Sequence, residues 1–433
     1  MTDLIPRDEV PLADYAPHAH GGPLHLINVT VNETVSGKTQ LERRDRKGLA
    51  MAVGPCGLSV GNDAHALWAP ADAATPTERS VQRALFEERT RTIVPLRSAS
   101  EGAPRHALHA NVRPSENAGT PVADLPRIEA LSLGRWVAIS GAAFTTGTGA
   151  NTRLGLSLLL GLANVRLGYW WDSGIAPRKP HRETGPNFFE LADRIVSRIL
   201  PVQACLMGEF FARFHGTARR HWYLSDGGHF ENTACYELIR RRVPFIICSD
   251  AGQDPRYQFE DLANLVRKSR TDFGAEIQVV YRNGDLKKED PGMIFLMPTL
   301  EQIVHPELLD VIGSPEDFPA LSGCDPNDDA CARPAMARRH ALLARIHYLD
   351  TNTFCWLLMI KPSLMGDESM DVMQYQRTHP LFPQEPTSDQ YFDEAQWESY
   401  RKLGGHIGTE LFTPPINAAK GWSPSLFAPP SVG

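Results

Sequence analysis

The sequence predicts an α/β protein in which a mainly parallel sheet is sandwiched between helices, with a C-terminal hairpin and helix packed on it. The main observation is the order strand, helix, strand, helix, strand between residues 221 and 282, which favours right-handed crossovers and parallel strands. The composition agrees with this class, because 433 residues, 42% of them apolar and 22% charged, are typical of a globular protein with a large core.

The N-terminal part predicts an arm, two strands and a loop. Residues 1–22 are polar and contain prolines, which predicts a flexible arm. The stretch LHLINVTVNETV alternates and is rich in β-branched residues, so it predicts a strand. GLAMAVGPCGLSVG predicts a second strand that ends in a glycine-rich turn. Residues 98–126 are rich in Pro, Ala, His and Asn and predict a long loop.

The next segment predicts a strand and three helices. RWVAIS, residues 135–140, predicts a strand that is followed by a turn of small residues. The apolar stretch Leu154–Trp171 predicts a buried helix, because its uninterrupted apolar run is well short of the roughly 20 residues that a membrane helix needs. FFELADRIVSRIL, residues 188–200, predicts another helix, and a further one is expected to end near residue 214.

The centre of the chain has the clearest pattern. Strands are expected at HWYLS, PFIICSDAG and AEIQVVYR, and helices at ENTACYELIRRR and FEDLANLVRKSRTDFG. Gly274 is placed to end the second of these helices.

The C-terminal part predicts a hairpin and a helix. ARIHYLDTNTFCWLLMIKPSL indicates a hairpin that turns at Asp350–Thr353. TSDQYFDEAQWESYRKLGG predicts one helix, with Thr387 and Gln390 at capping-box spacing and Gly404 at its end. Residues 411–433 predict an irregular tail.

Charge and cysteine content argue against two classes of protein. The formal net charge of −7 and the pI near 6.1 provide no basic field, so nucleic acid is not expected as a partner. Seven cysteines without repeated spacing favour a reducing compartment over a disulfide framework. The N-terminus lacks the apolar segment of a secretory signal. We therefore expect a cytoplasmic protein that is peripheral to a membrane if its substrate is a lipid.

No metal and no cofactor are predicted. His215, His221 and His229 cluster in sequence but lack metal-ligand spacing, and His229 is expected to cap or contact the neighbouring turn. The acidic segment 324–334 lacks the oxygen-ligand spacing of a calcium loop.

The stretch YLSDGGHFEN contains the main candidate for chemistry. Asp226 follows an expected strand, and Gly227 and Gly228 let the backbone turn sharply and approach a partner closely. An aspartate held there can act as a general base if it reaches a hydroxyl group. The alternative is a plain surface turn, since Asp-Gly-Gly is common in turns.

The surrounding segment SDGGHFENTACYELIRRRVPFIICSDAGQDP resembles the part of patatin-like acyl hydrolases that carries their catalytic Asp-Gly pair. GPLHLINVTVNET, DRKGLAMAVGPCGLSVG, WVAISGAAF, NVRLGYWW and HPLFPQEPTSDQYFDEAQWESYRKLG also resemble large bacterial patatin-like proteins. The resemblance covers residues 23 to about 407. It implies one patatin-like three-layer α/β domain over 23–410, and acyl-ester hydrolysis of lipids by a serine–aspartate dyad with Asp226 as the base.

The nucleophilic serine has two candidates in this chain. Ser59 lies in Gly57-Leu58-Ser59-Val60-Gly61, which matches the G-x-S-x-G elbow, but the residues after it form a poor helix. Ser140 follows an expected apolar strand and precedes Gly141, but both elbow glycines are replaced by alanine.

A third alternative is that the nucleophile lies outside this chain, which would then be the downstream portion of a patatin-like protein. Two functions therefore stay open. One is a lipid acyl hydrolase of the phospholipase or lysophospholipase type. The other is a non-catalytic portion that binds lipid, or that complements an upstream polypeptide bearing the serine.

Overall fold

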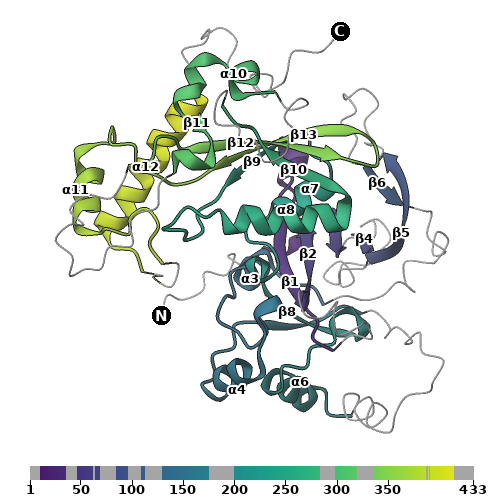
Figure 1. Ribbon diagram of the computed structural model, residues 1–433. Helices are drawn as coiled ribbons and strands as arrows, with labels where there is room; N and C mark the ends of the chain where they lie inside the picture. Colours follow the sequence, from purple (N-terminus) through teal and green to yellow (C-terminus); the bar gives the residue numbers. More distant parts are fainter. Residues whose placement is uncertain are drawn as a thin grey trace. The chain divides into compact units, whose positions relative to one another are not determined.

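The computed structural model describes residues 10–35, 46–61, 64–68, 84–95, 109–112, 129–174, 199–282, 298–318, 336–386, 389 and 391–413. The chain forms two compact units, Met1–Glu237 and Leu238–Gly433. Their boundary falls inside the segment 23–410 that the sequence predicts as one domain. Figure 1 shows the arrangement of the chain, with labels on many of its helices and strands.

An antiparallel sheet forms the first unit. Its described strands lie in the order β6-β5-β4-β3-β2-β1-β8-β7, and all neighbouring pairs are antiparallel. The connection between β2 and β3 is two residues long, and a connection that short joins only antiparallel strands. The strands are β1 (Ile27–Asn32), β2 (Gly48–Gly54), β3 (Gly57–Val60), β4 (Ala64–Trp68), β5 (Ala84–Pro95), β6 (His109–Val112), β7 (Tyr169–Asp172) and β8 (His221–Asp226).

The helices of the first unit are short. They are α3 (Leu133–Ser140), α4 (Leu154–Leu162) and α6 (Pro201–Phe210), with 3-10 turns at Leu12–Asp14, Pro17–His20, Gly149–Asn151, Gly216–Ala218 and Gly227–His229; α7 (Cys235–Arg240) spans the unit boundary. α3 covers the apolar face of the sheet, where Trp136 and Ile139 join the buried side chains of β1, β2, β3, β7 and β8. Leu12 belongs to the same core, so the predicted flexible arm is packed at this point.

The opposite face of this sheet is polar and still buried. Side chains alternate between the two faces of a strand, so Thr30 and Asn32 of β1 lie opposite Val29 and Val31, and both polar side chains are fully buried. In β8, Ser225 is paired with Thr30 and occupies this polar face.

A mixed sheet forms the second unit. β9 (Phe245–Ser249), β10 (Ala275–Val279), β12 (Ala341–Tyr348) and β13 (Thr353–Ile360) lie in the order β10-β12-β13-β9, and the short β11 (Ile312–Gly313) pairs with β12. The β9–β13 and β11–β12 pairs are parallel and the other two are antiparallel. The helices are α8 (Glu260–Phe273), α10 (Leu300–Ile303), α11 (Met370–Thr378) and α12 (Glu394–Phe412), with 3-10 turns at Pro306–Asp310 and Pro315–Asp317.

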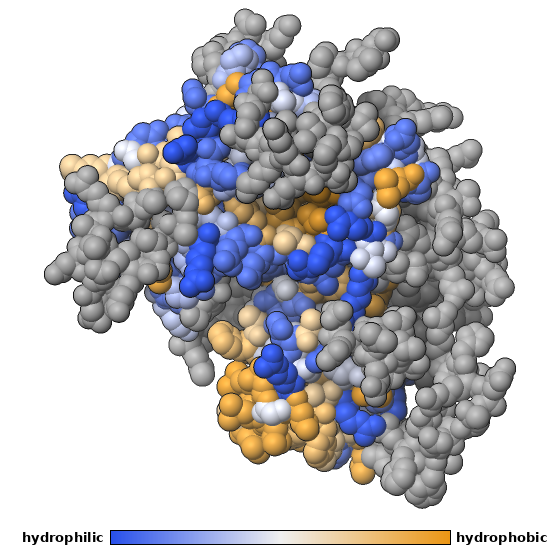
Figure 2. Space-filling model, in the orientation of Figure 1, coloured by the Kyte–Doolittle hydropathy of each residue, from blue (hydrophilic) through white to orange (hydrophobic). Residues whose placement is uncertain are grey.

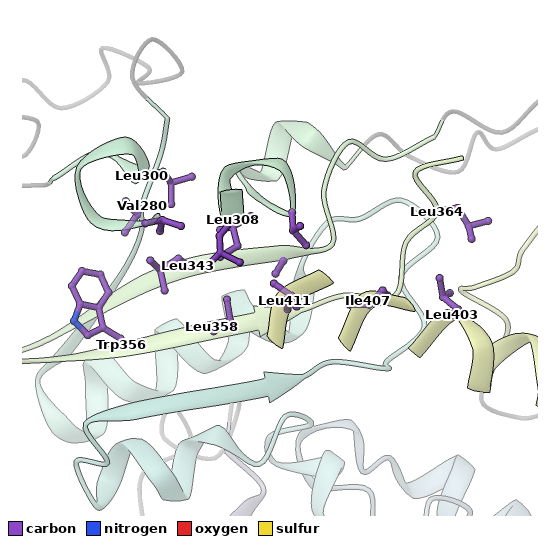
Figure 3. Close-up of a cluster of buried hydrophobic side chains, with 14 of the residues drawn as sticks. Val280, Leu300, Leu308, Leu343, Trp356, Leu358, Leu364, Leu403, Ile407 and Leu411 are labelled. Atoms are coloured by element: carbon purple, nitrogen blue, oxygen red, sulfur yellow. The ribbon is translucent and has the colours of Figure 1, made fainter. Parts of the chain in front are cut away.

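The core of the second unit lies between α12 and the sheet. Leu403, Ile407 and Leu411 recur at helical spacing along α12 and pack with Leu343 of β12 and Leu358 of β13 (Figure 3). α12 begins at the N-cap Asp393, whose Oδ1 accepts a hydrogen bond of 2.8 Å from the backbone N–H of Gln396.

The α/β class is confirmed, but the prediction of a mainly parallel sheet is wrong for the described strands. β8 and β9, which the sequence predicts to be linked by a crossover within one sheet, belong to different sheets. Short connections join β2 to β3 and β3 to β4, and such hairpins produce antiparallel pairs. The patatin-like three-layer sandwich stays a proposal.

Three helix and strand predictions are wrong. Residues 135–140 are the end of α3, not a strand, because Ser132 caps the helix and Trp136 and Ile139 share one helical face. The expected helix Leu154–Trp171 ends at Leu162, and its last residues belong to β7. Gly404 lies inside α12, which continues to Phe412.

Several other predictions of helices and strands are confirmed. The strand LHLINVTVNETV, the central strands and helices and the C-terminal hairpin are confirmed, as is Gly274, which ends α8 with a φ of +59°. The second strand is a hairpin of β2 and β3, and the predicted loop 98–126 contains β6. The predicted start of the C-terminal helix at Thr387 is wrong, because α12 begins after its N-cap Asp393. The helix over 188–198, the acidic segment 324–334 and the tail 414–433 lie outside the described residues.

Candidate functional site

Asp226 is the last residue of β8 and caps the turn that follows. Its Oδ1 accepts a hydrogen bond of 2.7 Å from the backbone N–H of Gly228. A Cβ on Gly227 would lie 2.6 Å from the backbone oxygen of Asn28, so only glycine fits where this turn passes β1. The turn is therefore closely packed, and a carboxylate oxygen of Asp226 is engaged by its own backbone.

Ser59 lies far from this turn. It is a residue of β3, paired with Ala52 of β2, and it is 5% exposed. Two strands separate β3 from β8, which places the two backbones about 14 Å apart at the usual spacing between strands. The pairing also assigns Ser59 to the polar face of the sheet and Asp226 to the apolar face. The structure does not bring these two side chains together.

Ser140 lies close to the turn but is not bonded to the carboxylate. It is the last residue of α3, and its hydroxyl donates a hydrogen bond of 2.8 Å to the backbone oxygen of Asn28. The same Asn28 oxygen is the close neighbour of Gly227. Gly141, which follows, has an ordinary φ of −101°. Ser140 therefore occupies the end of a helix, not a strand-to-helix elbow, and its hydroxyl is directed at a carbonyl group.

A buried hydrogen-bond network lies behind the turn. Asn32 Nδ2 donates to Ser225 Oγ at 2.8 Å, and Ser225 Oγ lies 2.9 Å from His229 Nδ1. The Asn32 Oδ1 atom accepts from the backbone N–H of Gly149, where a Cβ would lie 2.3 Å from the His229 oxygen. Burial lowers the pKa of His229, and the Asp226 carboxylate opposes this shift. We infer that the ring is neutral and accepts the Ser225 proton.

Sequence reasoning missed this Ser225–His229 pair. The signal that could have revealed the pair is the spacing of four residues across the Asp-Gly-Gly turn. In the structure Ser225 is fully buried, and its oxygen accepts a hydrogen bond from the Asn32 amide. The pair therefore holds the turn in place. The cavity beside the turn, lined by Asn28, Gly227, Phe230 and Tyr236 among others, has a volume of about 10 Å³. That volume holds one water molecule and no acyl chain.

A second feature of this unit is an exposed apolar surface over α4 and α6. α4 turns its small residues inward, with Ser157 and Gly161 buried, and turns its leucines outward, with Leu159 64% and Leu162 71% exposed. The prediction of a buried helix here is therefore wrong. We call this surface the α4–α6 face; its exposed apolar side chains are Phe144, Leu154, Leu156, Leu158, Leu159, Leu162, Val165, Leu167, Ile199, Leu200, Val202, Met207 and Phe211. Figure 2 shows it as a large orange area in the region of α4 and α6.

The polar face of the sheet explains this inverted burial. α6 buries Glu209, whose carboxylate accepts hydrogen bonds from Trp170 Nε1 at 3.0 Å and from Thr146 Oγ1 at 3.3 Å. The Tyr223 hydroxyl lies 2.6 Å from Thr145 Oγ1, and burial raises the pKa of Tyr223 to about 12. Because the layer beneath the helices is polar, their polar sides face inward and their apolar sides face outward.

The α4–α6 face lies in a locally basic segment. Residues 141–174 and 199–220 contain five arginines and two acidic residues, a net charge of +3 in a chain of net charge −7. Arg220 pairs with Asp172 at 2.7 Å and Arg166 lies 3.6 Å from Glu209. Arg153, at the start of α4, and Arg213, after α6, are exposed.

No protein-family model, curated protein or solved structure matches the chain. Among the described helices, none combines the length and the apolar character that crossing a membrane requires.

Proposed function

We propose that this chain binds a lipid surface through the α4–α6 face. The apolar side chains would lie among the acyl chains just below the headgroups, while Arg153 and Arg213 contact anionic headgroups. This is the second of the two functions that the sequence leaves open, a lipid-binding protein that does not complete the serine–aspartate dyad by itself. The observation that carries the proposal is the inverted burial of α4, with Ser157 inward and its leucines outward.

The magnitudes support a reversible attachment. Full burial of a leucine side chain contributes about 1.5–3 kcal/mol, and a basic residue near an anionic surface adds about 1 kcal/mol. Several half-exposed leucines and two arginines therefore suffice to hold the protein at a membrane. A monomeric protein seldom exposes a contiguous apolar area of this kind without a binding function.

Flotation with vesicles tests the proposal. We expect the protein to float with vesicles of equal parts phosphatidylcholine and phosphatidylserine, and less with phosphatidylcholine alone. Leu159→Glu/Leu162→Glu should abolish flotation. The matched control is Leu349→Glu, because Leu349 is 59% exposed in the second unit. Failure of the wild-type chain to float, or flotation of the double variant at the wild-type level, would contradict the proposal.

Acyl-ester hydrolysis of lipids is the second candidate function, and one observation favours it. Ser140 and Gly227 approach the same backbone oxygen, that of Asn28, so a hydroxyl lies next to the Asp226 turn. In this reaction Ser140 would attack the ester carbonyl and Asp226 would accept its proton. The Ser140 hydroxyl must first exchange its hydrogen bond to the Asn28 oxygen for one to the Asp226 carboxylate. The relationship to patatin-like proteins itself stays a proposal that rests on the sequence resemblance.

A fluorophosphonate probe separates the two functions. The proposal of lipid binding without a complete dyad predicts no labelling of the purified chain. Labelling that Ser140→Ala removes and Ser59→Ala leaves intact would establish the hydrolase instead. If an upstream polypeptide supplies the serine, the probe should label that polypeptide. This labelling should be lost when this chain carries Asp226→Asn.

A further inference from the structure

Two histidines and three acidic residues meet at one point of the second unit. His340 immediately precedes β12, Asp367 and Glu368 lie in the turn before α11, and His406 and Glu410 are one helical turn apart on α12. One possible ligand atom from each of His340, Asp367, Glu368 and His406 lies within 4.8 Å of all the others. These residues are up to 70 positions apart in sequence, which is why no spacing signal revealed them.

The His340 ring directs a nitrogen lone pair into this cluster. Its side chain is fully buried, and Nδ1 lies 2.9 Å from Ser363 Oγ. The backbone oxygens of Arg339 and Lys361 lie 2.9 and 3.2 Å from Ser363 Oγ and can take its one proton, and we infer that Oγ then accepts from His340 Nδ1–H. Nε2 is then unprotonated, and it is buried without a hydrogen-bond partner.

The His406 ring points its Nε2 at two carboxylates. Nε2 lies 3.3 Å from Asp367 Oδ1 and 3.5 Å from Glu410 Oε1, yet it makes no hydrogen bond and is buried. The other oxygen of Glu410 lies 4.0 Å from His340 Nε2. Two carboxylates thus face two imidazole nitrogens that are buried without a hydrogen-bond partner.

A cation is the ligand that satisfies such a set. The carboxylates of Asp367, Glu368 and Glu410 gather around the two rings, so negative charge is concentrated here. Glu368 is already engaged, because its oxygens accept from the backbone N–H groups of Met365 and Gly366 and so fix the turn that presents Asp367. A histidine held by a second hydrogen bond, as His340 is by Ser363, is typical of metal ligands.

We propose that His340, His406, Asp367 and Glu410 bind a divalent transition-metal ion, with Zn²⁺ as the best match. Two imidazoles and two carboxylates supply the N and O ligands that zinc binds, at ligand distances of about 2.0–2.2 Å. Calcium and magnesium prefer sets made of oxygen alone. This inference goes beyond the proposed lipid binding and concerns a different unit of the chain.

The site has an entry path. A cavity of about 420 Å³ between α11 and α12 is lined by Glu368, Arg401, Lys402 and His406 among other residues. The ion can therefore reach His406 from solvent without unfolding of the unit. Once bound, it would link α12 to the turn before α11 and to the start of β12.

Calorimetric titration with ZnCl₂ tests the site on the full chain after treatment with a chelator. We expect one equivalent to bind and the melting temperature to rise. His406→Gln and Glu410→Gln should each weaken binding by about tenfold or more, since even partners outside the ligand shell cost that much. Matched controls are His379→Gln and Glu394→Gln, which replace an exposed residue just after α11 and one at the start of α12. Both variants should bind zinc as the wild type does.

Two outcomes would overturn the proposal. One is a folded wild-type chain, verified by circular dichroism, that binds no zinc in the titration. The other is zinc binding of unchanged affinity in the folded double variant His406→Gln/Glu410→Gln, which would place the ion on cysteines or on surface groups. The double variant keeps the buried His340, so we expect it to fold. Circular dichroism of each variant checks that a loss of zinc binding is not caused by misfolding.

Discussion

At the scale of single residues, Asp226 acts as a turn cap. Its carboxylate satisfies the backbone N–H of Gly228, and Gly227 allows the close approach to Asn28. Two flexible glycines follow Asp226 at the end of a strand. Such glycines suit a catalytic base, but they are equally typical of a tight structural turn. The sequence alone therefore does not decide whether Asp226 is a catalytic base or a turn cap. The hydrogen bond from the Gly228 N–H to its carboxylate favours the turn cap.

Replacement of Asp226 tests the capping role. Asp226→Ala removes the acceptor for the Gly228 N–H and should lower the free energy of unfolding by about 1 kcal/mol, the usual cost of losing a cap. Asp226→Asn keeps an oxygen at this position and should lose less. Urea denaturation of both variants measures this. An alanine variant as stable as the wild type would show that the carboxylate does not hold the turn.

His229 should make stability depend on pH. Burial lowers the pKa of His229 in the fold below its ordinary value near 6.5. The unfolded chain therefore binds the proton more readily than the folded chain does. The neutral ring contributes fully to the free energy of unfolding at a pH above the unfolded pKa, and this contribution is lost as the pH falls below that pKa.

The comparison of variants isolates this group from the other histidines. His229→Gln keeps an acceptor for the Ser225 hydroxyl but cannot be protonated. The decline in the free energy of unfolding between pH 7 and pH 5 should be shallower in this variant than in the wild type. Equal slopes for the two proteins would mean that His229 titrates normally in the fold.

At the scale of the elements, α4 inverts the usual amphipathic pattern. Leu159→Gln and Leu162→Gln should change the free energy of unfolding by no more than about 0.5 kcal/mol, because these side chains are exposed. Ser157→Leu should destabilise by about 1–3 kcal/mol through overpacking, since Ser157 is fully buried and donates to the Thr146 oxygen at 2.6 Å. Thermal unfolding measures both effects. The opposite ranking would mean that the leucines form a core.

The sequence predicted many elements but not how they are arranged. Alternation in LHLINVTVNETV and the glycine at 274 are local signals, and both are confirmed. The run of leucines in α4 is also local, but which side it buries depends on the sheet beneath. There Asn32 and Tyr223 present polar groups, and they come from distant parts of the chain. Likewise, the strand predicted at 135–140 is a helix because Ser132 caps it.

At the scale of the whole chain, the two candidate sites belong to different units. The α4–α6 face lies within Met1–Glu237, and the proposed metal site lies within Leu238–Gly433. Sequence reasoning found the DGG turn but neither of these sites. The metal ligands converge only after β12, α11 and α12 have packed, and exposure of an apolar helix is a property of the tertiary structure.

The most direct test of lipid binding is hydrogen–deuterium exchange with and without anionic vesicles. We expect slower exchange in peptides that cover α4 and α6 when vesicles are present, because contact with lipid reduces the local opening that exchange requires. Peptides that cover α12 should be unchanged. Equal exchange in α4 and α6 with and without vesicles, under conditions in which the protein floats with them, would contradict the assignment of this face to the lipid surface.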